Sequence, residues 1–187
     1  MNEQVFEKFP ELQTERLHLV RHELIHAPDM YELRIDESVV QFLDTHPPKG
    51  IADIEAKITE NRSNFDDKKG ITWIIKMKRS DEAIGYMGIW RIDKHNNRGE
   101  LGYALKKQYW KKGIASEAAK AVINYGFLKM ELHTIMANTN PLNVGSKSLL
   151  TKLGFIHEAH FRQDYYFNGK YLDSDIYGLI KEEWTHE

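Results

Sequence analysis

The stretch that decides the fold is Tyr109-Trp110-Lys111-Lys112-Gly113-Ile114-Ala115-Ser116-Glu117-Ala118. It follows an apolar run, residues 101–105, that is typical of a strand, and it opens a segment with helical periodicity in which Ile114, Ala118 and Val122 share one line. A glycine at the mouth of a helix exposes the first unpaired backbone N–H groups, at the positive end of the helix dipole. The stretch therefore predicts either an anion site suited to a pyrophosphate or an ordinary strand–loop–helix connection.

Composition limits the class of protein. The chain has 187 residues, which suits one domain, and its formal net charge of -2 provides no basic field for nucleic acid. The absence of cysteine excludes a disulfide scaffold, a thiolate metal site and a cysteine nucleophile. The polar start, residues 1–4, does not read as a signal peptide, and no apolar run is long enough to span a bilayer. We expect one cytoplasmic domain over residues 1–187, with its core at about 11–184, no membrane partner and no metal.

Apolar periodicity and turn residues predict the other elements. Several strands come first and helices alternate with strands afterwards, which indicates an α/β (α+β) fold: a mixed sheet with helices on both faces. Asn168-Gly169 is a strong hairpin signal between the last two strands, and Gly154 would end the helix before them. The expected strands cover residues 12–21, 71–77, 83–92, 100–105 and 133–137, and the expected helices cover about 28–42, 51–65, 114–128 and 144–153.

The helix-mouth segment resembles the acetyl-CoA pyrophosphate loop of the GCN5-related N-acetyltransferase (GNAT) superfamily, whose pattern is Arg/Gln-x-x-Gly-x-Gly/Ala. Gly113 and Ala115 match that pattern, and Trp110 stands at its first position. Trp110 departs from the general pattern and looks like the branch that contains the ribosomal-protein N-terminal acetyltransferases (RimJ/RimL-like).

Three further segments are similar to that branch: residues 12–19, residues 100–103, and residues 143–146 with 152–155. The resemblance spans roughly residues 11–184 in the expected order. It implies the GNAT fold, a single, mostly antiparallel twisted sheet that is splayed at its centre, and it implies acetyl-CoA as the co-substrate.

The resemblance also implies which residues bind the coenzyme. The strand at 100–105 is expected to separate from its neighbour at a bulge, and a glycine at position 102 is compatible with such a bulge. Backbone N–H groups around Tyr103 and Ala104 could then hold the thioester carbonyl. The expected cofactor-binding residues are Tyr103, Ala104, Leu105, Trp110, Lys111, Lys112, Gly113, Ile114, Ala115, Ser116 and Asn143.

Two lysine pairs flank the loop, Lys106-Lys107 and Lys111-Lys112. They could add positive charge for the phosphates of the coenzyme, including its 3′-phosphate, or they could be solvated surface.

Glu100 is the candidate general base. It ends a polar turn and starts an apolar strand, near the point where the strands should separate, and it would act on the incoming ammonium through water. The alternative is a sheet-edge carboxylate paired to a neighbouring cation.

The candidate acid is Ser146. Many members of the wider family place a tyrosine seven residues after the late-helix asparagine, but that position here is Leu150. Ser146 matches the serine of the ribosomal-protein branch and could protonate the leaving thiolate directly or through water. Its alternative role is to cap the helix, and Asn143 could cap the helix or contact the coenzyme arm.

These residues predict an N-acetyltransferase that transfers acetyl directly from acetyl-CoA to a primary amine in a ternary complex. The branch favours the α-amine of a ribosomal or other protein. A small-amine acetyltransferase for a polyamine, amino acid or antibiotic, and a non-catalytic acyl-CoA-binding module, are the alternatives. Nucleic acid is not an expected partner, and both a monomer and a homodimer are compatible with the sequence.

Overall fold

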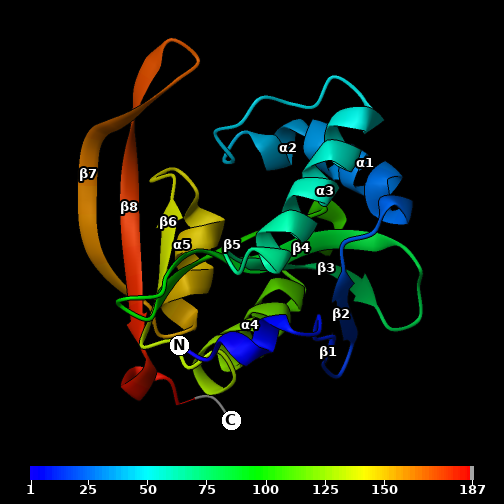
Figure 1. Ribbon diagram of the computed structural model, residues 1–187. Coiled ribbons are helices and arrows are strands. Elements are labelled where there is room, and N and C mark those ends of the chain that lie inside the picture. Colours follow the sequence, from blue (N-terminus) through cyan, green and yellow to red (C-terminus); the bar gives the residue numbers. More distant parts are fainter. Residues whose placement is uncertain (186–187) are drawn as a thin grey trace.

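A computed structural model describes residues 1–185 (Figure 1). Its eight-stranded sheet has the order β1-β2-β3-β4-β5-β6-β8-β7, antiparallel throughout except for the β5–β6 pair. The strands are β1 (Leu12–Gln13), β2 (Leu17–Arg21), β3 (Ile71–Met77), β4 (Ala83–Asp93), β5 (Arg98–Leu105), β6 (Thr134–Thr139), β7 (Ile156–Phe167) and β8 (Lys170–Ile180). The α-helices are α1 (Ala27–Ile35), α2 (Glu37–Val40), α3 (Ile51–Asp66), α4 (Ile114–Leu128) and α5 (Val144–Lys152), and the 3-10 helices are η1 (Glu3–Phe6), η2 (Leu24–His26), η3 (Lys107–Tyr109) and η4 (Lys181–Glu183). Residues 186–187 of the expected domain lie outside the described residues.

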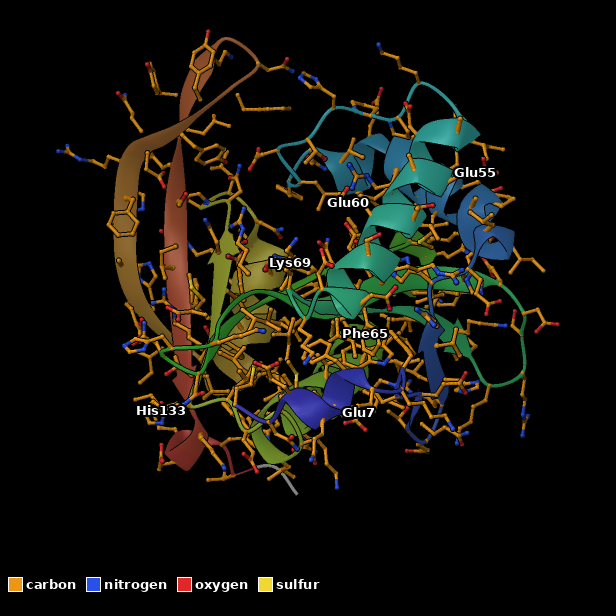
Figure 2. The ribbon with its side chains drawn as sticks, in the orientation of Figure 1. Glu7, Glu55, Glu60, Phe65, Lys69 and His133 are labelled. Atoms are coloured by element: carbon orange, nitrogen blue, oxygen red, sulfur yellow. The ribbon has the colours of Figure 1, made fainter. Side chains whose placement is uncertain are left out.

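The two faces of the sheet carry separate cores, which confirms the expected layering. Alternate residues of a strand point to opposite faces, so Trp73 joins a core with α4 and α5, whereas Ile74 joins a second core with α1, α2 and α3. Phe65, in the last turn of α3, packs against Phe6 of η1, and the centroids of their rings are 5.2 Å apart (Figure 2).

The N-terminal strand is the element that the sequence analysis got wrong. Residues 12–21 form two short antiparallel strands, with Leu12 opposite Leu19, instead of one strand. The break is a turn in which the Thr14 N–H donates to the Leu17 carbonyl at 3.1 Å and the Thr14 hydroxyl accepts from the Leu17 N–H at 3.0 Å. The Asn168-Gly169 hairpin is confirmed, and both of its residues have positive φ, as a primed turn requires.

The sheet opens at its centre, between β5 and β6. These strands pair only where Arg98–Glu100 meets Thr134–Met136, although both strands continue beyond that point. This splay confirms the expected GNAT geometry.

The bulge, however, does not lie at Gly102. It lies on β4 between Trp90 and Asp93, where Arg91 has a φ of +49°. Gly102 pairs in register with Gly88, and a Cβ on it would lie 1.8 Å from Trp90 Cζ2. The absence of a side chain at Gly102 therefore lets the Trp90 ring lie against β5.

Candidate active site

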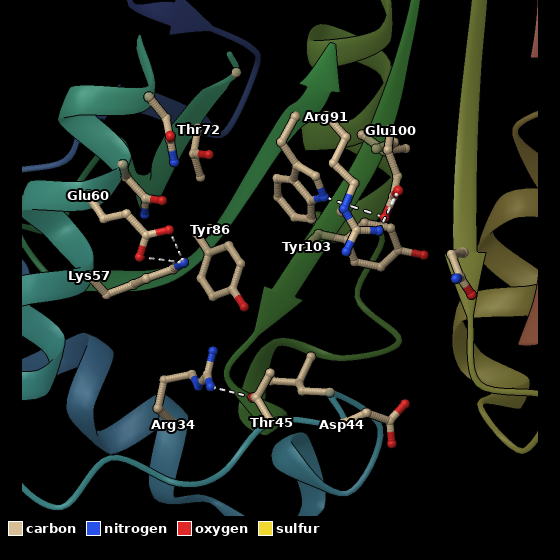
Figure 3. A pocket seen from close by; sticks show the side chains of 18 of the residues that line it. Arg34, Asp44, Thr45, Lys57, Glu60, Thr72, Tyr86, Arg91, Glu100 and Tyr103 are labelled. Atoms are coloured by element: carbon tan, nitrogen blue, oxygen red, sulfur yellow. Dashed lines mark hydrogen bonds and ion pairs between the residues drawn. The ribbon is translucent and has the colours of Figure 1, made fainter. Parts of the chain in front are cut away.

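A cleft of about 1620 Å³ occupies the α1–α3 side of the sheet and reaches the opening between β5 and β6 (Figure 3). Tyr86 and Trp90 of β4, Glu100 and Tyr103 of β5, and Ser146 of α5 are among the residues that line it. The Gly113 loop leads into α4 on the opposite face. The opening therefore joins the two sides of the sheet.

Glu100 is the last residue of β5 that pairs with β6, so it lies where the sequence analysis expected the strands to separate. Its side chain is buried, and its Oε2 accepts a hydrogen bond from Arg91 Nη1 at 2.9 Å. Trp90 Nε1 donates to Oε1 at 3.4 Å. Glu100 thus lines the cleft and is also paired to a neighbouring cation, so the structure combines features of both sequence-based alternatives.

Tyr103 contributes a hydroxyl group that the sequence analysis missed. Its side chain leaves β5 on the α4–α5 side, and its hydroxyl lies 2.7 Å from Ser146 Oγ. Burial raises the pKa of Tyr103 to about 12, so the hydroxyl remains protonated at neutral pH. The strand pattern alone gave no signal for this contact, because the two residues lie 43 positions apart.

Asn143 caps α5, the first of the two roles considered for it. Its Oδ1 accepts from the Ser146 N–H at 3.0 Å, which makes Asn143 the N-cap of α5. The Ser146 hydroxyl instead meets Tyr103, so the capping role considered for Ser146 is wrong. Leu150 is fully buried.

The backbone of Tyr103 faces the opening. Alternate residues of an antiparallel strand direct their backbone groups to the same partner. The Lys106 N–H bonds the Ile84 carbonyl of β4 at 2.8 Å, so Ala104 also faces β4. Tyr103 and Leu105 face the other way, and the Leu105 carbonyl accepts from Trp110 Nε1 at 2.7 Å. Of the two residues expected to hold the thioester carbonyl, Tyr103 has its N–H on the open side.

Gly113 is the N-cap of α4, with a φ of +77° that favours glycine. The first N–H groups of α4, those of Ile114, Ala115 and Ser116, have no preceding turn to bind. The Ile114 side chain is buried in the core, so its backbone is the part available to an anion. A Cβ on Gly113 would lie 3.3 Å from Arg16 Nη2, so that side of the loop is already occupied by a guanidinium.

Arg16 is a second residue of this region that the sequence analysis did not place there. Its Nε donates to Glu117 Oε2 at 2.6 Å, and its Nη1 donates to the Lys112 carbonyl at 3.0 Å. Burial alone would raise the pKa of Glu117, but the hydrogen bonds from Thr14 and Arg16 hold it below its usual value. The turn between β1 and β2 is thereby fixed to the first turn of α4.

Lys106 has neither of the roles considered for it. Its side chain is buried, and its Nζ contacts carboxylates of Asp29 at 3.0 Å, Glu32 at 3.1 Å and Glu82 at 2.9 Å. Burial alone would lower the pKa of Lys106, but the three carboxylates raise it above its usual value. Lys106 therefore ties the end of β5 to α1, while Lys107, Lys111 and Lys112 remain exposed beside the loop.

These features fit acetyl-CoA. The helix mouth at Gly113 offers N–H groups for a diphosphate, the Tyr103 backbone offers hydrogen-bonding groups at the opening, and the Tyr103–Ser146 hydroxyl pair lies beyond them. In residues 1–185, no three His, Cys, Asp or Glu side chains are grouped so that they could hold a metal ion. No helix in this described part of the chain is long and apolar enough to cross a membrane.

Comparisons with known proteins agree with this geometry. The family model described as acetyltransferase (GNAT) domain matches residues 16–156. The uncharacterized N-acetyltransferase p20 of Bacillus licheniformis is 32% identical over 174 residues, which cover 93% of this chain and 98% of that protein. The [ribosomal protein uS5]-alanine N-acetyltransferase of Escherichia coli is 34% identical over 85 residues, which cover 46% of this chain and 44% of that protein.

A solved GNAT-family acetyltransferase from Bacillus anthracis shares the fold, with a TM-score of 0.83 at 23% identity over 93% of this chain and 100% of that chain. The chain therefore belongs to the GNAT family and is an N-acetyltransferase with acetyl-CoA as its co-substrate.

Proposed function

We propose that this enzyme transfers acetyl directly from acetyl-CoA to the α-amine of a peptide or protein, with both substrates bound together. The proposal rests on one observation: a candidate base for the amine and candidate proton donors for the thiolate reach the same opening, between β5 and β6. Glu100 reaches it from the cleft side, and the Tyr103–Ser146 pair reaches it from the α4–α5 side. An amine in the cleft would thus approach a thioester held between β5 and β6.

Glu100 is assigned the role of base. An α-amine with a pKa near 8 needs only about 1 kcal/mol to lose its proton at pH 7, whereas a lysine amine near 10.4 needs about 4–5 kcal/mol. Glu100 already accepts a hydrogen bond from Arg91, and we assign it to the amine that needs less free energy to lose its proton. The proton would pass to Glu100 through a water molecule.

Tyr103 is assigned two roles. Its backbone N–H would bind the carbonyl oxygen as negative charge develops there, a contact that contributes roughly 2.7–4 kcal/mol per donor in acyl-transfer enzymes. As the new N–C bond forms and the C–S bond breaks, the thiolate would take a proton from the Tyr103–Ser146 pair, which solvent then restores. The pKa of about 12 keeps the Tyr103 proton in place until that step.

An α-amine is favoured over a polyamine as the acceptor because carboxylates of the cleft are already paired within the protein. Glu60 pairs with Lys57 at 2.9 Å and Asp67 pairs with Lys69 at 2.7 Å, so lysines of the protein already offset the charge of these two cleft carboxylates. The similarity to the uS5-alanine N-acetyltransferase, over 46% of this chain, supports a protein terminus as acceptor.

The test is a competition at equal concentration, with release of the coenzyme thiol and the mass of each product as readouts. The competitors are a peptide with a free N-terminus, the same peptide blocked at its N-terminus but carrying lysine, and spermidine. We expect the free N-terminus to be acetylated fastest. Faster acetylation of spermidine or of the lysine side chain would reassign the acceptor.

A further inference from the structure

The β4 bulge turns Arg91 into the acceptor cleft. In a regular strand, Arg91 would follow Trp90 on the opposite face of the sheet. The bulge between Trp90 and Asp93, together with the left-handed φ of +49° at Arg91, brings both side chains to Glu100. Bulges are used in this way to re-aim a side chain beside an active site.

The guanidinium of Arg91 is only partly used by Glu100. One nitrogen, Nη1, makes the 2.9 Å bond, and 71% of the side chain is exposed. A guanidinium has five N–H donors in a planar fork that suits a carboxylate. Figure 3 shows Arg91 directed from β4 toward Glu100 at the edge of the cleft, so the rest of the fork faces an incoming acceptor.

The same end of the cleft carries further positive charge. Lys68 and Lys94 both line the cleft, and they share a single carboxylate, that of Glu3, at 2.8 Å and 3.1 Å. Lys69 and Asp67, which also line the cleft, pair with each other at 2.7 Å, so the two lysines that share Glu3 keep more positive than negative charge between them. An acceptor with a negative group near its amine would be attracted to this end of the cleft.

We infer that Arg91 selects acceptors that carry an acidic side chain at the second residue, next to the amine that Glu100 receives. The inference rests on the proposed acetylation of peptide α-amines. Consecutive Cα atoms lie about 3.8 Å apart, so a carboxylate one residue from the terminus reaches the neighbourhood of a guanidinium that itself contacts Glu100. Arg91 therefore binds the acidic side chain while Glu100 handles the amine.

The experiment compares kcat/KM for three peptides that begin Ala-Asp, Ala-Asn and Ala-Lys and are otherwise identical. The enzymes are the wild type, Arg91→Gln, Arg91→Lys and the control Arg62→Gln, which changes an exposed arginine of α3. We expect the wild type to prefer Ala-Asp over Ala-Asn by roughly fivefold, as an exposed ion pair of up to about 1 kcal/mol gives. The ratio should fall to about one in Arg91→Gln and be largely retained in Arg91→Lys and in Arg62→Gln.

The ratio is the informative quantity because the loss of Arg91 also alters Glu100, and that effect is common to all three peptides. A wild-type ratio of one, or a ratio that Arg91→Gln leaves unchanged, would overturn the role of Arg91. A failure to acetylate any of the peptides would instead refute the proposed acceptor class.

Discussion

Replacing Gly102 with alanine should damage catalysis by displacing the Trp90 ring. The added Cβ would lie 1.8 Å from Trp90 Cζ2 and 2.0 Å from Trp90 Cη2. Carbon atoms are in favourable contact at about 3.5 Å, so the indole must move by about 1.7 Å. Trp90 Nε1 already lies 3.4 Å from Glu100 Oε1, and a displacement of that size breaks the bond.

The expected cost follows from this displacement. Overpacking a well-packed site costs roughly 1–3 kcal/mol, which for a chain of this length lowers the melting temperature by roughly 2–12 °C. A misplacement of about 1 Å at a reacting group can reduce the rate by about 10²-fold. We therefore expect Gly102→Ala to lower kcat by roughly 10–100-fold while acetyl-CoA still binds.

The assay combines thermal unfolding, calorimetry with acetyl-CoA and steady-state release of the coenzyme thiol. Gly50→Ala is the matched control, because a Cβ at Gly50 meets nothing within 4 Å. Trp90→Phe removes the two carbon atoms that clash most severely, so Gly102→Ala should cost much less stability in that background. An equal cost in both backgrounds, or wild-type kcat and melting temperature for Gly102→Ala, would refute the reasoning.

Four further changes test other parts of the site and fold. Glu100→Gln should reduce turnover by roughly 10²–10⁴-fold in the thiol-release assay, and by less for an acceptor amine of lower pKa. Tyr103→Phe should reduce turnover less than Glu100→Gln and leave calorimetric acetyl-CoA affinity nearly intact, because a thiol with a pKa near 8.5 is already a fair leaving group. Gly113→Asp should abolish measurable acetyl-CoA binding in a folded protein, because it places a carboxylate and a Cβ at the helix mouth. Burial lowers the pKa of His22 to about 3, so as the pH falls the unfolded chain takes up a proton on this histidine before the folded chain does. The free energy of unfolding therefore decreases as the pH falls from about 6.5 toward 3, by about 2 kcal/mol at pH 5. His22→Gln should make the urea midpoint depend less on pH over that range.

Each of these predictions has an outcome that contradicts it. A loss of turnover in Tyr103→Phe as large as that in Glu100→Gln, or a clear loss of acetyl-CoA affinity, would contradict the role given to the Tyr103 hydroxyl. Normal turnover of Glu100→Gln at pH 7 would reduce Glu100 to a structural partner of Arg91. An unchanged pH dependence of stability in His22→Gln would assign the acid lability to other groups. Unchanged acetyl-CoA affinity in folded Gly113→Asp would remove the helix mouth from the coenzyme site.

The sequence predicted the parts of the fold that local patterns control. The periodicity of Ile114, Ala118 and Val122 gave α4, whose core-facing line is buried as expected, and Asn168-Gly169 gave the last hairpin. The central splay came from the resemblance rather than from periodicity, because strand separation depends on how far β5 pairs with β6.

The missed contacts depend on partners that are distant in sequence. Lys106 is neutralised by carboxylates 24, 74 and 77 positions away, so its position beside the coenzyme loop in the sequence was misleading. Trp90 and Gly102 meet because the β4–β5 register places Trp90 opposite Glu100. A slip of one residue would send every side chain of the strand to the other face, so the contact depends on how the two strands pair and not on either strand alone.

The departure at Trp110 has a structural explanation of the same kind. The general pattern places Arg or Gln at the first position of the loop, but here the Trp110 indole N–H turns inward and satisfies the Leu105 carbonyl at the end of β5. The guanidinium beside the loop belongs to Arg16, which binds the Lys112 carbonyl and Glu117 from the turn between β1 and β2. Residues 14–17 and 110–115, which look like separate features of one branch, are therefore two sides of a single contact, and a substitution on either side should be judged by its effect on the other.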